Sequence, residues 1–239
     1  MKKKWIIIGG SIFLALLLVL FVAVILDFKT EDVLEDEIEE VVLQMNRGND
    51  SLVYKLLNRT VCDDDYKTVE KQAKLYLKDL YSNMTGIKEI INDDELVMVL
   101  SYDNYVKDGK DFSVTYNYLL STINKLKKYR NNCKKLMTKE GKYSYIKDKK
   151  IDDYYKEYFM DEVLDDDDEY DLSFLDEVID LVNDEKDVID FLVSCKDSWD
   201  LKDGRIVFND NNLNRKYQEL LAEVTGNLLF DEDDDDSSI

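Results

Sequence analysis

The sequence of 239 residues contains no histidine and no proline, and only eight glycines and three cysteines. Without histidine, the Ser-His-Asp triad, the Cys-His pair, the HExxH zinc site and the imidazole pH switch are all excluded. The glycines are scattered, and neither GxxxxGK[ST] nor GxGxxG occurs, so no phosphate-cradling loop is expected. We therefore expect no cofactor and no metal site. The lack of proline removes the usual helix breaker and suits long helices.

Basic residues are far fewer than acidic residues. The chain has 32 lysines and arginines against 53 aspartates and glutamates, which gives a formal net charge of −21 and a pI near 4.4. A surface that binds nucleic acid must be cationic to contact the phosphates. The composition therefore predicts no nucleic-acid partner.

The N-terminus has the pattern of a membrane anchor. Lys2, Lys3 and Lys4 precede Trp5, and residues 6–26 form a run of 21 uncharged residues. At about 1.5 Å per residue, a helix of this length spans the roughly 30 Å hydrocarbon core of a bilayer. Trp5 stands where interfacial aromatic residues occur. We predict a cytoplasmic basic tip at residues 1–4 and a transmembrane signal-anchor helix at residues 5–26.

The charges that flank this segment predict its orientation. Three lysines precede it, whereas Asp27, Glu31 and Asp32 follow it, so the positive-inside rule places the N-terminus in the cytoplasm and the C-terminal domain outside. The predicted location is the cell membrane, crossed once. A cleaved signal peptide is the alternative, although the run is long and ends without a small-x-small cleavage site. Ser11 and Ala15 form a small-xxx-small pair that makes a homodimer possible without supporting one.

Residues 27–230 are predicted to form one extracytoplasmic helical domain. Apolar residues recur there at spacings of three and four, the pattern of amphipathic helices that bury one face. The clearest stripes are Leu34, Ile38, Val41 and Met45; Val69, Ala73, Tyr76, Leu80, Met84, Ile87 and Ile91; Leu119, Ile123, Leu126, Cys133 and Met137; Val188, Leu192, Cys195 and Trp199; and Leu213, Tyr217, Leu220, Val224 and Leu228. The expected fold class is all-α, a transmembrane helix followed by a helical bundle.

Signals for strands are few. Residues 206–208 are β-prone and follow Asp203 and Gly204, and residues 111–118 and 142–146 are ambiguous. We expect at most a minor β-hairpin or short strands. Residues 231–236 are six consecutive acids, and such a block is typical of solvated chain, so residues 231–239 are predicted to be an acidic disordered tail.

Charge is segregated along the domain. Residues 116–150 carry 11 lysines and arginines against two acids, whereas residues 151–200 carry 20 acids against three lysines. One interpretation is that the basic helix packs against the acidic helices and neutralises them. A second is that the basic face binds an anionic polymer of the cell envelope or the outer membrane surface, and a third is that the charges are solvated and have no specific role. The candidate residues for such a face are Lys125, Lys127, Lys128, Arg130, Lys134 and Lys135.

The cysteines are three, so at least one thiol stays unpaired even if a disulfide forms outside the cell. Cys133 and Cys195 both fall on apolar stripes, where cysteine acts as a small hydrophobe. Buried thiols are therefore the preferred interpretation, and Cys133 with Cys195 is the best candidate disulfide. A catalytic cysteine is not expected, because no histidine is present to activate it.

These features favour a membrane-anchored extracytoplasmic helical protein with an interaction or structural role in the cell envelope. Its partners would be the membrane, through residues 5–26, and an unidentified envelope protein or polymer. The first alternative is a binding module for an anionic envelope polymer through residues 116–150. The second is a carboxylate-dependent envelope hydrolase, which would need a pocket holding a carboxylate of raised pKa. No catalytic residue is assigned, and we do not expect an enzyme.

Overall fold

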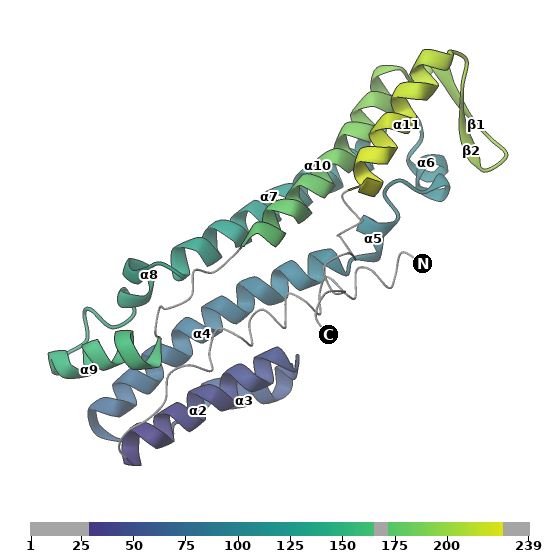
Figure 1. Cartoon of the computed structure of the whole chain (residues 1–239). Helices are drawn as coiled ribbons and strands as arrows, with labels where there is room; N and C mark the ends of the chain where they lie inside the picture. The colour runs from purple at the N-terminus through teal and green to yellow at the C-terminus, as the bar shows by residue number, and fades with distance from the viewer. Residues whose placement is uncertain (1–28, 165–171, 227–239) are drawn as a thin grey trace, which may run out of the picture. The chain divides into compact units, whose positions relative to one another are not determined.

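A computed structural model describes residues 29–164 and 172–226 (Figure 1). The described chain is mostly helical, which confirms the all-α class of helical bundle. Its elements are α2 (Lys29–Asn46), α3 (Asp50–Asn58), α4 (Asp64–Ile91), α5 (Asp94–Val97), α6 (Tyr102–Asp108), α7 (Ser113–Leu136), α8 (Lys139–Tyr143), α9 (Asp153–Tyr158) with a π-helical turn (Phe159–Val163), α10 (Ser173–Ser194), a 3₁₀ turn (Lys196–Ser198), β1 (Trp199–Lys202), β2 (Arg205–Phe208) and α11 (Asn211–Gly226).

None of the helices described in residues 29–164 and 172–226 is long and apolar enough to cross a bilayer. The predicted anchor at residues 5–26 and the predicted tail at residues 231–239 both lie outside the described residues.

The described residues divide into two compact units. The first unit comprises residues 29–88 and 129–164, and the second comprises residues 89–128 and 172–226. The sequence analysis treats residues 27–230 as one domain and does not resolve this division. The chain passes between the units three times, and two of these boundaries fall inside α4 and α7, whereas the third follows residue 171. Because α4 and α7 are continuous helices, no polar linker or glycine-rich segment marks the boundaries inside them.

The core of the first unit is built from the predicted stripes of α2 and α4. Leu34, Val41, Val69 and Ala73 are fully buried, as the 3-4 spacing predicts. Gly48 ends the first helix in the left-handed conformation, with φ of 66°, and its N–H donates to the Met45 carbonyl oxygen. The short helix α3 follows directly and buries Val53 and Leu56 against the core; the sequence analysis misses it.

Two glycines of the first unit lie where a Cβ atom would clash with a neighbouring segment. A Cβ on Gly141 would lie 1.9 Å from the Lys135 carbonyl oxygen, at the turn between α7 and α8. A Cβ on Gly86 would lie 2.4 Å from the ring of Tyr129, which packs directly on the α4 backbone. Glycine therefore permits both the α7–α8 turn and the contact between α4 and the last turns of α7.

The second unit packs α10 against α11 and carries the β1–β2 hairpin (Figure 1). Asp203 and Gly204 form its two-residue turn with φ of 52° and 76°, the signature of a type I′ turn. The β-prone residues 206–208 are therefore part of a strand, whereas the ambiguous residues 113–118 and 142–143 are helical. Trp199 at the start of β1 is buried and donates its indole N–H to the Leu192 carbonyl oxygen at 2.8 Å.

Candidate functional site

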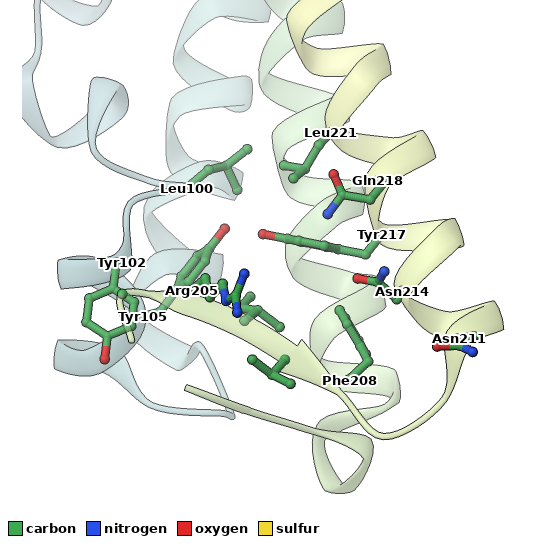
Figure 2. A pocket seen from close by; sticks show the side chains of 13 residues that line it. Leu100, Tyr102, Tyr105, Arg205, Phe208, Asn211, Asn214, Tyr217, Gln218 and Leu221 are labelled. Carbon is green, nitrogen blue, oxygen red and sulfur yellow. The ribbon is translucent and has the colours of Figure 1, made fainter. Parts of the chain in front are cut away.

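A pocket of about 550 Å³ opens in the second unit beside β2 (Figure 2). This volume lies within the range of roughly 300–1,000 Å³ typical of ligand pockets. We call it the β2 pocket, and its walls come from β2 and the turn before it, from α6 and Leu100, and from α11. Its lining residues are Leu100, Tyr102, Tyr105, Gly204, Arg205, Ile206, Val207, Phe208, Asn211, Asn214, Tyr217, Gln218 and Leu221.

Two tyrosines form the closed end of the β2 pocket. Tyr105 of α6 and Tyr217 of α11 are 3% and 8% exposed, and their hydroxyls point toward one another (Figure 2). Burial raises the pKa of both phenols, and the neighbouring Tyr217 raises that of Tyr105 further. Both groups therefore stay neutral. The geometry is not that of a directed hydrogen bond, because the Tyr105 oxygen is buried without such a partner in the described residues.

Aromatic packing holds the pocket walls in place. Phe208 of β2 lies 5.4 Å from the ring of Tyr217 and 6.1 Å from that of Phe191 on α10, measured between centroids. On the other side, Phe112 packs edge-on against Tyr105 and stacks on Trp199, with centroids 5.4 and 6.0 Å apart. Such pairs contribute about 0.5–1.5 kcal/mol each beyond the area they bury. Contacts between aromatic rings therefore hold the pocket on both sides.

Phe112 adopts an unusual backbone conformation to reach this place. It is fully buried with φ of 45°, in the left-handed region that bulky residues avoid. Asp108 accepts hydrogen bonds from the Val114 and Thr115 N–H groups, and so caps the start of α7 immediately after Phe112. Lys110 lies over the Trp199 ring at 4.9 Å and pairs with Asp200 at 2.8 Å. These contacts hold the segment between α6 and α7 against the hairpin.

The polar lining of the β2 pocket, within the described residues, consists of one guanidinium, amides and hydroxyls. Its polar groups are the guanidinium of Arg205, the amides of Asn211, Asn214 and Gln218, and tyrosine hydroxyls; no carboxylate lines it. A carboxylate hydrolase needs two carboxyl groups in one cleft. The carboxyl of raised pKa that burial produces, on Glu35, belongs to the first unit. The hydrolase hypothesis therefore gains no candidate residues here.

A buried ionic cluster ties α2, α3 and α4 together in the first unit. Lys74 donates to Glu70 at 2.6 Å and also to Glu37 and the Arg59 carbonyl oxygen. Glu70 accepts from the Val61 and Cys62 N–H groups as well. Burial by itself would raise the pKa of Glu37, but hydrogen bonds from Arg59 and Lys74 outweigh it and lower that pKa. The cluster is saturated by its own members, which indicates a structural role.

A second buried group of acids lies at the start of α2. Glu31 accepts hydrogen bonds from the Tyr66 and Tyr154 hydroxyls at 2.6 and 2.8 Å. Glu35 accepts one long hydrogen bond, of 3.4 Å, from Tyr158, and its other carboxylate oxygen is buried without a partner in the described residues. Burial, followed by the nearby charges of Asp32, Glu31 and Glu162, raises the pKa of Glu35 although the Tyr158 hydrogen bond opposes the shift.

The predicted basic face is largely on the surface. Lys125, Lys127, Lys128, Lys134 and Lys135 are exposed, and Arg130 is half-buried. Lys127 and Lys134, like Lys128 and Lys135, are seven residues apart on α7 and so lie on nearly the same face two turns apart. In residues 29–164 and 172–226, Lys125, Lys127, Lys128 and Lys135 make no ion pair.

The three cysteines are free thiols in this structure. Cys62 and Cys133 are buried, and burial raises the pKa of each thiol to about 11. Cys195 is half-buried, and its Sγ contacts the Phe191 carbonyl oxygen at 3.1 Å. The buried-thiol interpretation therefore fits Cys133 better than Cys195. The candidate disulfide between these two stays a prediction; Cys133 belongs to the first unit and Cys195 to the second.

The sequence analysis does not identify the β2 pocket. Hydrophobic spacing predicts Tyr217 only as a core residue, and Asp203-Gly204 is predicted only as a turn. Nothing in the sequence pattern relates either of them to Tyr105. Comparisons with protein-family models, with curated proteins and with solved structures find no significant match to this chain. Any function must therefore be inferred from the residues of the chain.

Proposed function

We propose that this protein is a single-pass membrane protein that presents an acidic helical domain outside the cytoplasm for docking to a partner in the cell envelope. The observation that carries the proposal is the run of 21 uncharged residues at positions 6–26, preceded by three lysines and followed by acids. An anchor confines the domain to the membrane surface and so raises its effective concentration for partners held there.

The β2 pocket adds a place for docking. It combines buried rings with a few polar side chains and contains no carboxylate, the composition of a recognition site. We propose that the pocket binds its partner without catalysing a reaction, so the partner is expected to dissociate chemically unchanged.

Protease accessibility on intact cells tests the topology. A C-terminal epitope tag on the full chain should be lost when protease is added without lysis. A released species of smaller mass before protease treatment would indicate a cleaved signal peptide. Protection of the tag until lysis would overturn the proposal. A variant with Lys2, Lys3 and Lys4 all changed to Glu provides the matched comparison, because reversing these charges should reduce or invert the outward orientation.

A second candidate function, binding of an anionic envelope polymer, is favoured by the exposed lysines of α7, of which Lys125, Lys127, Lys128 and Lys135 make no ion pair within the described residues. Long polyphosphate serves as the probe. Its affinity for the full chain in detergent should fall steeply as NaCl rises, because binding releases counterions. Changing Lys127, Lys128, Lys134 and Lys135 to Gln should abolish it.

The matched control for this test changes the same number of charges elsewhere. Lys55, Lys67, Lys71 and Lys78 are exposed lysines of α3 and α4 without an ion pair in the part of the chain that the structure describes. Changing these four to Gln should leave polyphosphate binding within about twofold. Equal losses in both variants would mean that net charge alone, and no defined face on α7, governs the binding.

A further inference from the structure

We infer that the outer edge of β2 accepts an extended, acidic peptide of a partner protein as a third strand, with the peptide's side chains entering the β2 pocket. The inference rests on the proposed docking function and goes further, since it names the site and the chemical class of the partner.

The hairpin register determines which backbone groups of β2 are free. Lys202 and Arg205 flank the two-residue turn and form a hydrogen-bonded pair, as do Asp200 and Val207 two residues further on. The Asn209 N–H donates to the Ser198 carbonyl oxygen at 2.9 Å, which continues the same alternation. The N–H and C=O groups of Ile206 and Phe208 therefore point away from β1. In the described residues no hydrogen bond takes them up.

The β2 pocket lies at this free edge. All four residues of β2 line it, rather than every second residue as expected for a pocket on one face of the hairpin. No residue of β1 is among its lining. The pocket therefore borders β2 on the side away from β1, between the strand, α6 and α11 (Figure 2).

This placement selects an extended polypeptide as the ligand. A row of alternating N–H and C=O groups is complementary to another strand, and strand addition is an established mode of peptide recognition. Edges without such a pocket offer hydrogen bonds alone. Here the buried rings of Tyr105 and Tyr217, with the half-buried Leu221 beside them, provide an apolar surface for one side chain of the added strand. The buried Tyr105 hydroxyl has no directed partner in the described residues.

Charge selects an acidic sequence. Lys202 and Arg205 stand directly opposite one another, and like charges in such a cross-strand pair destabilise a hairpin. Neither side chain forms an ion pair within the described chain. A carboxylate on the added strand beside Arg205 would relieve this repulsion. In a protein with net charge −21, an arginine that lines the pocket and has no ion pair within the described residues is a specific feature, and Lys202 stands beside it across the turn.

The test selects peptides from a phage-displayed library of random twelve-residue sequences against the full chain in detergent micelles. Enriched peptides should carry acids next to alternating apolar residues. Residue-resolved amide exchange with the best peptide should show at least tenfold slower exchange at Ile206 and Phe208. The amides of Arg205 and Val207 already donate to β1 and should not change, so they are internal controls.

Substitutions then identify the charged contact. Arg205→Gln should weaken binding of the best peptide at least tenfold and reduce its salt dependence. Arg215→Gln is the matched control, because Arg215 is an exposed arginine of α11 outside the pocket lining, and its binding should stay within about twofold.

Three results would overturn the inference. They are the absence of any enriched peptide, binding without added protection of Ile206 and Phe208, and binding that appears only after residues 227–239 are removed. The last result would mean that this chain's own C-terminal segment occupies the edge. None of these measurements depends on membrane topology, so a failure here is distinguishable from a failure of the proposed location.

Discussion

Lys74 of α4 and Glu37 of α2 form an ion pair whose side chains are only 4% and 2% exposed. Glu70, one turn before Lys74, is equally buried and completes the cluster. A buried pair of this kind adds little net stability, but removal of one partner leaves the other charged and desolvated. The energetic consequence is therefore much larger for a single substitution than for the pair as a whole.

The first prediction follows from this relationship. Lys74→Met should destabilise the protein by about 3–5 kcal/mol, since it leaves Glu37 and Glu70 buried without their shared cation. Urea unfolding followed by circular dichroism measures the change. Lys71→Met, an exposed position on the same helix, should stay within about 0.5 kcal/mol of the wild type. Equal effects in the two variants would contradict a structural role for the cluster.

The second prediction concerns pH and Glu35. Because burial raises the pKa of this carboxyl in the folded state, the folded protein is favoured while Glu35 is protonated. That contribution is fully present below the ordinary pKa of glutamate and is lost as pH rises through the raised value. Glu35→Gln should therefore raise the melting temperature at pH 7 and change it little at pH 4.

The control for Glu35 is Glu39→Gln, an exposed glutamate of the same helix. Its melting temperatures at pH 4 and pH 7 should both follow the wild type. A melting temperature of Glu35→Gln that is lower than the wild type at pH 7 would mean that the ionised carboxylate is stabilising, contrary to its burial.

The third prediction concerns thiol reactivity. Cys62 and Cys133, with pKa values of about 11, should react with a thiol reagent at pH 8 far more slowly than in guanidinium chloride. Cys195 is half-buried and should react first in the folded protein. Three free thiols after unfolding without reductant would agree with the structure. A single titratable thiol would instead indicate one disulfide, and peptide mapping would show whether it joins Cys133 to Cys195.

The fourth prediction tests the turn between α7 and α8. Gly141→Ala places a Cβ against the Lys135 carbonyl oxygen, a backbone atom that cannot give way without moving the helix end. We expect a loss of stability of about 1–3 kcal/mol, as for other overpacked sites, measured by urea unfolding. Gly226→Ala is the control, because no described residue lies within 4 Å of a Cβ there. Its effect should be neutral or slightly stabilising, and a larger loss there would discredit the steric explanation.

Part of the candidate site was predictable. The Asp203-Gly204 turn and the β-prone residues after it indicate a hairpin, and the stripe through Tyr217 indicates a helix with a buried face. Tyr105 was not predictable, because α6 is too short to carry a periodic stripe. The sequence also did not predict the burial of three charged residues, Glu37, Glu70 and Lys74. Charged residues on an amphipathic helix are expected on its exposed face.

The predicted helical stripe through Cys195 and Trp199 was wrong at its end, because α10 ends at Ser194 and Trp199 begins β1. The sequence did predict the helical class, the buried stripes of α2, α4, α7 and α11, and the turn at Asp203 and Gly204, because hydrophobic spacing and turn conformation are local properties. It also carries the only information on the anchor. Tertiary structure decided the division into two units, the pairing of buried charges and the β2 pocket, whose walls run from Leu100 to Leu221. Burial of a charge or closure of a pocket depends on which distant segments meet, and residue periodicity does not specify those partners.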